Sequence, residues 1–208
     1  MNRILILFAH PRFEKPRVNR ALLAAIRDNP AVTLNDLYEL YPDFNIDEER
    51  EKALLTAHRV LVWQHPFYMY SAPALLKQWI DLVLEHGWAH GRGGDALKGK
   101  LVFNALTSGG TRKEYAAGGY NRFTIGEFLL PFNQTAARCG MIYLPPFTVQ
   151  GTYLLTAADL EYHALRYCTL LDRLSQGDFD VESLQTFSFL NDWLDSETGG
   201  HSHEFHFS

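Results

Sequence analysis

Residues 60–82 constrain the fold of this chain more than any other stretch. The run opens with residues 60–63, which are all apolar and include two β-branched valines, as is typical of a strand buried on both faces. An aromatic loop follows, and apolar side chains then recur at helical spacing from Leu76 to Leu84. A buried strand that leads through a loop into an amphipathic helix is typical of a parallel sheet covered by helices.

The rest of the chain alternates strands and helices in the same way. Apolar runs predict strands at residues 3–9, 32–37, 60–63, 100–107 and, more weakly, 141–149, where Pro145 and Pro146 interrupt the run. Helical spacing predicts helices at residues 18–28, 48–57, 76–84, 124–139 and 157–175, with a kink at Pro131. Because parallel neighbours need right-handed crossovers, we expect an α/β, flavodoxin-like three-layer sandwich with a five-stranded parallel sheet of order 2-1-3-4-5.

Chain length favours one domain. The 208 residues, 47% of them hydrophobic and 21% charged, suffice for one substantial core. We expect this domain at residues 1–177 and a C-terminal extension at 178–208, whose last residues have a disordered composition. The extension carries apolar residues expected to pack on a dimer mate or a partner: Phe187, Phe189, Leu190, Trp193 and Leu194. Its final histidines, His201, His203 and His206, lack a rigid frame and a fourth ligand, so we expect no metal site.

Charge and cysteine content narrow the class of protein. A formal net charge of −5 and a pI near 6.0 disfavour a polyanion-binding surface, so we expect no nucleic-acid partner. There is no apolar run of about 18 residues and no secretory pattern near Met1, which favours a cytoplasmic protein. Cys139 and Cys168 stand alone, so we expect reduced, structural thiols.

Three loops should meet at one edge of the predicted sheet. Ligands of open parallel sheets bind outside the carboxyl ends of the strands, near the point where the strand order reverses. Here that point lies between the first and third strands. The loops that follow the first, third and fourth strands span residues 10–19, 65–72 and 107–120.

The first loop is basic and opens a helix. Arg12, Lys15 and Arg17 add positive charge next to the free N–H groups of a helix start, which favours a phosphate. The loop has neither GxGxxG nor GxxxxGK[ST], which argues against a dinucleotide fingerprint or a P-loop. On these residues alone, a solvated basic loop is an equally good interpretation.

The other two loops offer rings and bare backbone. Residues 66–70 place three aromatic rings and a thioether where a planar heteroaromatic ligand can lie, although ordinary core packing would also explain them. Residues 107–110 offer hydroxyls and glycine backbone for close approach to a ligand, although a plain turn would look the same. The three loops together favour a flavin mononucleotide site over these separate explanations.

Longer motifs at these positions resemble the flavodoxin-like NAD(P)H:quinone oxidoreductases, in particular the small quinone-reductase-type ancillary subunits of bacterial glutathione-gated (Kef) potassium efflux systems. The resemblance covers residues 3–175. Its motifs are Ala9-His-Pro11 with Asn19, LYELYPDFNID at 37–47, WQHP at 63–66, YSAPALLKQWID at 70–81, HGWAHG at 86–91, LKGK at 97–100, TSGG at 107–110 and LPPF at 144–147.

The resemblance implies a homodimer that holds one FMN per subunit, rather than the FAD of longer relatives. It implies two-electron hydride transfer from NADH or NADPH to a quinone or related electrophile. A nicotinamide and a quinone that use the pocket in turn would give ping-pong kinetics. The cofactor-binding residues would be His10, Pro16, Arg17, Val18, Asn19, Pro66, Phe67, Tyr68, Met69, Tyr70, Thr107, Ser108, Gly109 and Gly110.

Two positions depart from the family pattern. Pro16 stands where the family usually has a phosphate-loop Ser, and it brings neither a hydroxyl nor an N–H. We expect charge from Lys15 or Arg17 to compensate for that loss. Ser108 stands in place of a second Thr and keeps the hydroxyl, so we expect little effect.

Tyr115 is the candidate catalytic residue, because its phenol can donate a hydrogen bond to the reduced flavin or to a quinone oxygen, and the alternative is a surface aromatic without a role in the reaction. His65 is expected to be structural, and the family resemblance suggests that Trp88 and residues 120–132 help to close the pocket across a dimer. Two other functions stay open. One is a regulatory subunit that activates a Kef-type potassium efflux protein at the inner face of the membrane, with enzyme activity secondary. The other is an FMN electron carrier like flavodoxin.

Overall fold

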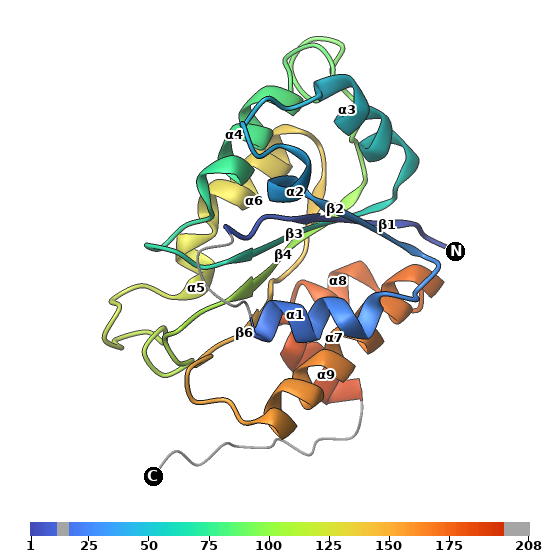
Figure 1. Cartoon of the computed structure of the whole chain (residues 1–208). Helices are drawn as coiled ribbons and strands as arrows, with labels where there is room; N and C mark the ends of the chain where they lie inside the picture. The colour runs from blue at the N-terminus through green and yellow to red at the C-terminus, as the bar shows by residue number, and fades with distance from the viewer. Residues whose placement is uncertain (12–16, 198–208) are drawn as a thin grey trace.

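A twisted parallel sheet forms the middle layer of the molecule (Figure 1). The computed structural model describes residues 1–11 and 17–197. The strands run in the order β2-β1-β3-β4-β5, β6 also pairs with β4, and all the pairings are parallel. This confirms the predicted fold class and strand order, with one more strand than expected. The strands are β1 Ile4–Phe8, β2 Val32–Asp36, β3 Val60–Pro66, β4 Leu101–Thr107, β5 Ile142–Tyr143 and β6 Phe147–Val149.

The helices cover both faces of the sheet. Figure 1 shows α1, α7, α8 and α9 on one side and α2, α3, α4 and α6 on the other. Side chains of β1 alternate between the two cores: Leu5 and Leu7 join one cluster, whereas Ile4 and Ile6 join the other. The helices are α1 Arg17–Ile26, α2 Leu37–Leu40, α3 Glu48–Ala57, α4 Ala74–Val83, α5 Ile125–Phe128, α6 Leu130–Arg138, α7 Ala157–Gln176, α8 Val181–Leu184 and α9 Leu190–Glu197.

Local sequence signals explain where several helices begin and end. The Asp47 side chain accepts a hydrogen bond from the Arg50 N–H and caps α3. Thr156 and Asp159 form a capping box at the start of α7, which ends at Gly177 in the left-handed conformation. These signals explain why residues 48–57 form a helix within the predicted bounds.

Prolines divide two elements that the sequence analysis treated as continuous. The predicted helix at 124–139 is two helices, α5 and α6, which meet at Leu129. Pro131 lies in the first turn of α6, where the backbone N–H that proline lacks would have no partner within the helix. The sequence predicted a kink at Pro131, and the structure has instead a break between two helices just before it. The predicted fifth strand is likewise two short strands, because Pro145 and Pro146 supply no N–H to the ladder.

The extension after Gly177 folds back on its own chain. Leu190, Trp193 and Leu194 are 0%, 2% and 3% exposed and pack in the core beside α7. The expectation that these residues pack on a dimer mate or a partner is therefore wrong, because this chain already buries them. The domain boundary at residue 177 stays a prediction, and the expectations for His201, His203 and His206 fall outside the described residues.

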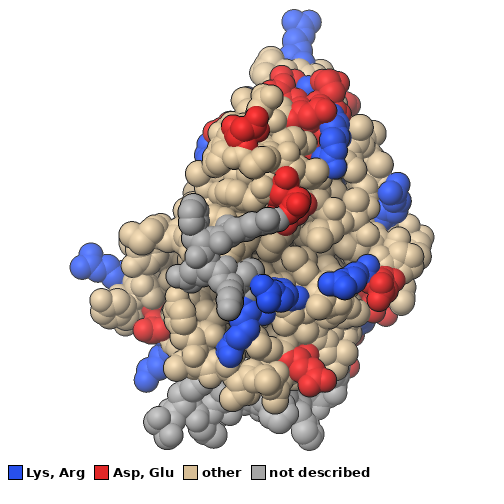
Figure 2. Space-filling view, in the orientation of Figure 1, with Lys and Arg blue, Asp and Glu red and all other residues tan. Residues whose placement is uncertain are grey.

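Surface charge is mixed on the face that Figure 2 shows, where basic and acidic side chains are interspersed over a mostly uncharged surface. Within residues 1–11 and 17–197, no helix combines the length and the apolar composition that crossing a membrane requires.

Candidate functional site

A cavity of about 330 Å³ opens at the carboxyl ends of β1, β3 and β4. It lies where the strand order reverses, which is the edge that the sequence analysis selected. Its lining residues are His10, Arg17, Val18, Asn19, Pro66, Phe67, Tyr68, Thr107, Gly109, Thr152 and Tyr153. The three predicted loops therefore converge on one cavity, and a fourth segment, after β6, joins them.

Most of the predicted binding residues line this cavity. Met69, Tyr70, Ser108 and Gly110 lie in the same loops but are not part of its lining. Pro16, with its neighbours Arg12 and Lys15, lies outside the described residues. The predictions for these positions are thus neither supported nor contradicted by the lining.

The start of α1 faces the cavity. Arg17, Val18 and Asn19 are the first three residues of this ten-residue helix, so their N–H groups have no acceptor within the helix. These groups and the positive end of the helix dipole favour an anion. The Arg17 guanidinium donates a hydrogen bond to the Leu155 carbonyl, which ties the start of α1 to the segment after β6.

A chain of buried side chains fixes the cavity floor. The Tyr167 hydroxyl donates to Gln64 Oε1 at 2.9 Å, and Gln64 Nε2 donates to Asn19 Oδ1 at 3.1 Å. Asn19 Nδ2 then donates to Thr107 Oγ1 at 3.1 Å. Because Thr107 Oγ1 accepts this bond, its own O–H remains available to donate toward an acceptor atom in the cavity.

The aromatic loop after β3 makes a tight turn. Tyr68 and Ser71 exchange two backbone hydrogen bonds of 3.0 Å, and between them Met69 and Tyr70 have φ values of 45° and 66°. Left-handed backbone in residues other than glycine costs roughly 1–3 kcal/mol each and concentrates at functional sites. The turn leaves Met69 88% exposed at the rim of the cavity.

The aromatic rings of this loop lie in two different environments. Phe67 and Tyr68 line the cavity, so these two provide the aromatic wall. Tyr70 instead stacks on Phe128, with the ring centres 5.1 Å apart. Core packing, the alternative explanation for the loop, applies to Phe67, which is 7% exposed and belongs to a core cluster, and to Tyr70 in part. Tyr68 and Tyr70 are 41% and 45% exposed.

The glycine loop after β4 is tied to the segment after β6. The Ser108 N–H donates to the Val149 carbonyl at 3.0 Å, and the Gly151 N–H donates to the Gly110 carbonyl at 3.0 Å. The Ser108 hydroxyl is used within the loop, where it donates to the Gly110 carbonyl at 2.8 Å. These bonds place Thr152 and Tyr153 against Gly109.

Thr152 and Tyr153 are the lining residues that sequence reasoning missed. The sequence predicts residues 141–149 as one strand, and the segment beyond it is not among the three predicted site loops. The pairing of β6 with the end of β4, Thr107 with Val149, brings that segment to the cavity. Tyr153, an aromatic residue shortly after β6, is the feature of the sequence that could have identified this segment.

His65 is a structural histidine. Its ring is fully buried, contacts the Pro66 carbonyl through Nδ1 at 3.0 Å and accepts from the Asn104 amide through Nε2 at 3.0 Å. Burial lowers the pKa of His65 to about 4, so the ring is neutral at pH 7. His10 lines the cavity, is only 7% exposed and contacts the Pro11 carbonyl through Nδ1 at 2.8 Å.

Tyr115 lies behind the aromatic wall. Its ring meets Phe67 edge to face at 5.6 Å, and it packs so closely on Gly110 that a Cβ there would lie 2.7 Å from Tyr115 Cε2. Burial, with Tyr70 and Glu114 nearby, raises the pKa of Tyr115, so the phenol is protonated at neutral pH. The structure thus brings Tyr115 next to a lining residue but not into the lining itself.

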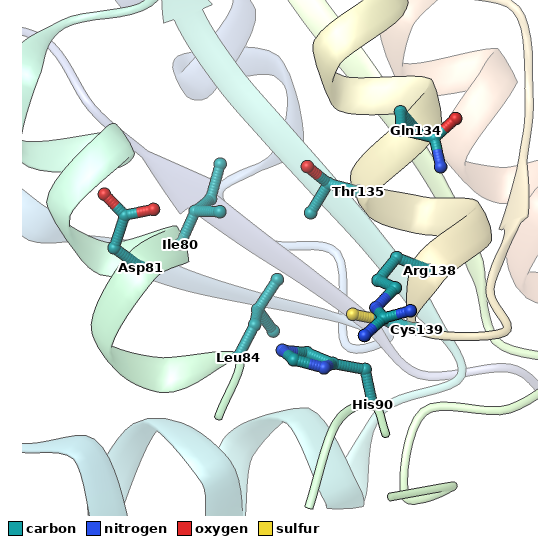
Figure 3. A pocket seen from close by; sticks show the side chains of 8 residues that line it. All are labelled: Ile80, Asp81, Leu84, His90, Gln134, Thr135, Arg138 and Cys139. Carbon is teal, nitrogen blue, oxygen red and sulfur yellow. The ribbon is translucent and has the colours of Figure 1, made fainter. Parts of the chain in front are cut away.

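A second cavity, of about 360 Å³, lies between α4 and α6 (Figure 3). Ile80, Asp81 and Leu84 face it from α4, and His90 closes one end, whereas Gln134, Thr135, Arg138 and Cys139 border it from the α6 side. It shares no lining residue with the first cavity. Burial raises the pKa of Cys139, so its thiol stays protonated at neutral pH, and no predicted site residue is among the lining residues of this cavity.

Comparisons with known proteins agree on the family. A family model described as a flavodoxin-like fold matches residues 2–171. The glutathione-regulated potassium-efflux system ancillary protein KefG of Serratia proteamaculans (strain 568) is 46% identical over 165 residues, which are 79% of this chain and 90% of that protein.

Two solved structures bear on the site. General stress protein 14 of Treponema denticola, in complex with FMN, is 38% identical with a TM-score of 0.78, over 83% of this chain and 99% of that one. An NADPH-quinone reductase of P. pentosaceus is 31% identical with a TM-score of 0.74, over 81% of this chain and 96% of that one.

Proposed function

This chain belongs to the flavodoxin-like NAD(P)H quinone oxidoreductase family, and from that premise we propose that it is an FMN-dependent enzyme that passes electrons from NADH or NADPH to quinones or related small electrophiles. One observation carries the proposal. A helix start, an aromatic wall and a glycine loop, from three distant parts of the sequence, line one cavity at the switch point of the sheet.

The residues that line the cavity fit FMN part by part. The N–H groups of Arg17, Val18 and Asn19, which have no acceptor within α1, suit the phosphate. Phe67 and Tyr68 suit the face of the isoalloxazine. We propose that the following residues also contact FMN: His10, Pro16, Pro66, Met69, Tyr70, Thr107, Ser108, Gly109 and Gly110. The FMN complex of the Treponema denticola protein supports this choice of cofactor.

When bound, FMN would supply the redox chemistry, namely acceptance of a hydride from the nicotinamide and its delivery to the quinone. The protein's share is to position the reactants and to donate hydrogen bonds. The Thr107 O–H, left free by the bond from Asn19, would donate to a ligand carbonyl or ring nitrogen. Tyr68 and Tyr153 border the open side of the cavity and would contact whichever substrate enters.

We expect both substrates to use this cavity in turn, because Tyr68 and Tyr153, the residues proposed to contact them, line the same cavity. Initial rates measured over a grid of NADPH and quinone concentrations test this, with FMN in excess. Parallel double-reciprocal lines are expected from a ping-pong mechanism. Intersecting lines would contradict a shared site, and activity independent of added FMN in flavin-stripped protein would contradict the cofactor.

Tyr115 remains the proposed catalytic donor. A protonated phenol next to Phe67 could reach a ligand after a small side-chain movement. Tyr115→Phe removes the donor and keeps the ring packing, so kcat should fall while the KM for NADPH changes little. Unchanged turnover with every quinone tried would exclude this role.

We also propose that the chain is a homodimer whose second subunit covers the mouth of the site. Large hydrophobic side chains stand exposed in the loops after β3, β4 and β6, and these are Tyr68, Met69, Tyr70, Tyr120, Phe123 and Tyr153. Sedimentation analysis should give twice the mass of 23.8 kDa. Met69→Lys, at an 88% exposed side chain, should shift the protein toward monomer without unfolding it.

A second candidate function is regulatory. The 46% identity to KefG supports the proposal that this chain binds a Kef-type potassium efflux protein at the cytoplasmic face of the membrane. Potassium efflux should then rise when the chain is expressed with its transporter. The Tyr115→Phe variant should raise potassium efflux as well, although its turnover is reduced. Fast turnover with no effect on a cognate transporter would leave the enzyme as the only function.

A further inference from the structure

The C-terminal extension touches the loop that follows β4. Arg112 in that loop donates to both carboxylate oxygens of Asp192 in α9, with both distances 2.7 Å. The same guanidinium lies over the Phe189 ring, 4.7 Å from its centre. A two-point ion pair combined with a cation–π contact defines the position of the guanidinium far better than a single surface ion pair does.

A second attachment joins α9 to β6. Asn191 accepts from the Thr148 N–H at 2.9 Å and donates to the Thr148 carbonyl at 3.0 Å. The Leu190 N–H donates to the Pro146 carbonyl at 3.0 Å. The Asn191 side chain thus imitates a neighbouring strand, and it fixes the strand that leads into Thr152 and Tyr153 of the cavity.

The helix that makes these attachments is itself firmly held. Trp193 is buried and lies under the Arg173 guanidinium of α7 at 4.5 Å. Arg166, also in α7, bonds to Asp195 and to the Asn191 carbonyl. The start of α9 is therefore a rigid support, fixed to the helix layer beneath the sheet (Figure 1).

By contrast, residues 111–122 of the loop after β4 make most of their polar contacts among themselves, whereas residues 108–110 are bonded to the segment after β6. The Glu114 carboxylate accepts from the N–H and the hydroxyl of Thr111, and the Asn121 N–H donates to the Glu114 carbonyl. Within the described part of the chain, the Arg112–Asp192 pair is the polar contact that joins residues 111–122 to a distant element. This loop carries Tyr115 and continues from Gly109 and Gly110.

We propose that Arg112 and Asp192 are positioning residues, which lock the loop after β4 to α9 and so hold Gly109, Gly110 and Tyr115 in place at the cavity. The family match ends at residue 171, so Asp192 lies beyond the matched region, whereas Arg112 lies within it. The inference rests on the proposed function for its effect on cofactor and substrate, but the lock itself can be tested without either.

Asp192→Asn and Arg112→Gln test the lock, and the charge swap Arg112→Asp with Asp192→Arg tests whether the pair acts as a unit. Glu197→Gln is the control, because it breaks another ion pair of α9, with Arg173 at 3.1 Å, that does not reach the loop. Each protein is examined by amide hydrogen exchange of residues 108–122 without FMN, by FMN titration and by steady-state kinetics.

Both single variants should speed exchange in residues 108–122, weaken FMN binding and lower kcat/KM for the quinone by about tenfold, which is less than the roughly hundredfold that a 1 Å misplacement can cost. The swap should recover part of each loss, and Glu197→Gln should leave all three unchanged. Unchanged exchange in both single variants would overturn the lock. Faster exchange with unchanged FMN affinity and kinetics would overturn the positioning role. A wild-type chain that binds no FMN would overturn the proposed function, and the exchange data alone would then decide whether the lock exists.

Discussion

Gly109 and Tyr153 are in such close contact that a Cβ on Gly109 would lie 2.5 Å from Cε2 of the Tyr153 ring. The two residues come from different loops, and both line the cavity at the end of the sheet. A methyl group at residue 109 would therefore displace the Tyr153 ring. The backbone conformation of Gly109 is an ordinary one, whereas the space for a side chain is taken.

Gly109→Ala should therefore act on the cavity and little on stability. Tyr153 is 82% exposed, so its ring can swing away from the new methyl group at small cost. We expect FMN affinity to fall about tenfold, because the displaced ring and the methyl group both crowd the glycine loop. Quenching of FMN fluorescence measures the affinity. Gly126→Ala, whose Cβ would meet only Thr124 Oγ1 at 3.8 Å, should bind FMN like the wild type.

Thr107→Val should weaken FMN binding while Thr107→Ser should not. Valine keeps the shape of threonine but removes the O–H donor, and it leaves Asn19 Nδ2 without its acceptor at 3.1 Å. Serine keeps the hydroxyl. We expect about a tenfold difference in dissociation constant between the two variants, measured by isothermal calorimetry. Equal affinities would show that the hydroxyl makes no bond to the ligand.

Glu51→Gln should destabilise the fold at a distance from the cavity. The fully buried carboxylate accepts from Asn35 Nδ2 at 2.7 Å, from the Tyr41 hydroxyl at 2.7 Å and from Trp79 Nε1 at 2.8 Å. An amide cannot accept all these bonds, so the free energy of unfolding should fall by about 3 kcal/mol in urea. Glu49→Gln on the same helix, where the side chain is 86% exposed, should change it by less than about 0.5 kcal/mol.

The neutral His65 makes stability depend on pH. Its pKa is about 4 in the folded chain and near 6.5 when unfolded, so between these values the unfolded state binds more protons. Stability should therefore fall as the pH falls through this window, by ~2 kcal/mol at pH 5 from His65 alone. Burial lowers the pKa of His58 and His163 as well, in the same direction.

Urea unfolding of the wild type and His65→Gln at pH 7 and pH 5 isolates this contribution. The variant should lose less stability between the two pH values than the wild type does, because it lacks the His65 contribution. It should still lose some stability, because His58 and His163 remain in both proteins. An identical loss in both proteins would show that His65 is not the group responsible.

Sequence patterns predicted the sheet well, because its strands are apolar runs separated by breakers. Strands β1 and β4 lie within their predicted bounds, and the strand order follows from alternation and crossover handedness. The three site loops were predictable for the same reason, since strand ends of a parallel sheet share one edge. The basic, aromatic and glycine residues of these loops then suggested which part of a flavin each loop could bind.

The fourth cavity segment and the packing of α9 were not predictable in this way. Tyr153 reaches the cavity because β6 pairs with the last residues of β4, a register that Pro145 and Pro146 conceal in the sequence. Trp193 and Leu194 are buried by contacts with α7, and the spacing of apolar residues alone does not tell whether such a face packs on its own chain or on another.

Visible absorption during FMN binding and anaerobic NADPH titration tests the central claim most directly. The purified chain should retain FMN or bind one per chain when it is added. The flavin absorption should then be lost with one NADPH per FMN and return with one quinone. A protein that stays colourless and that added FMN does not turn yellow would contradict the account.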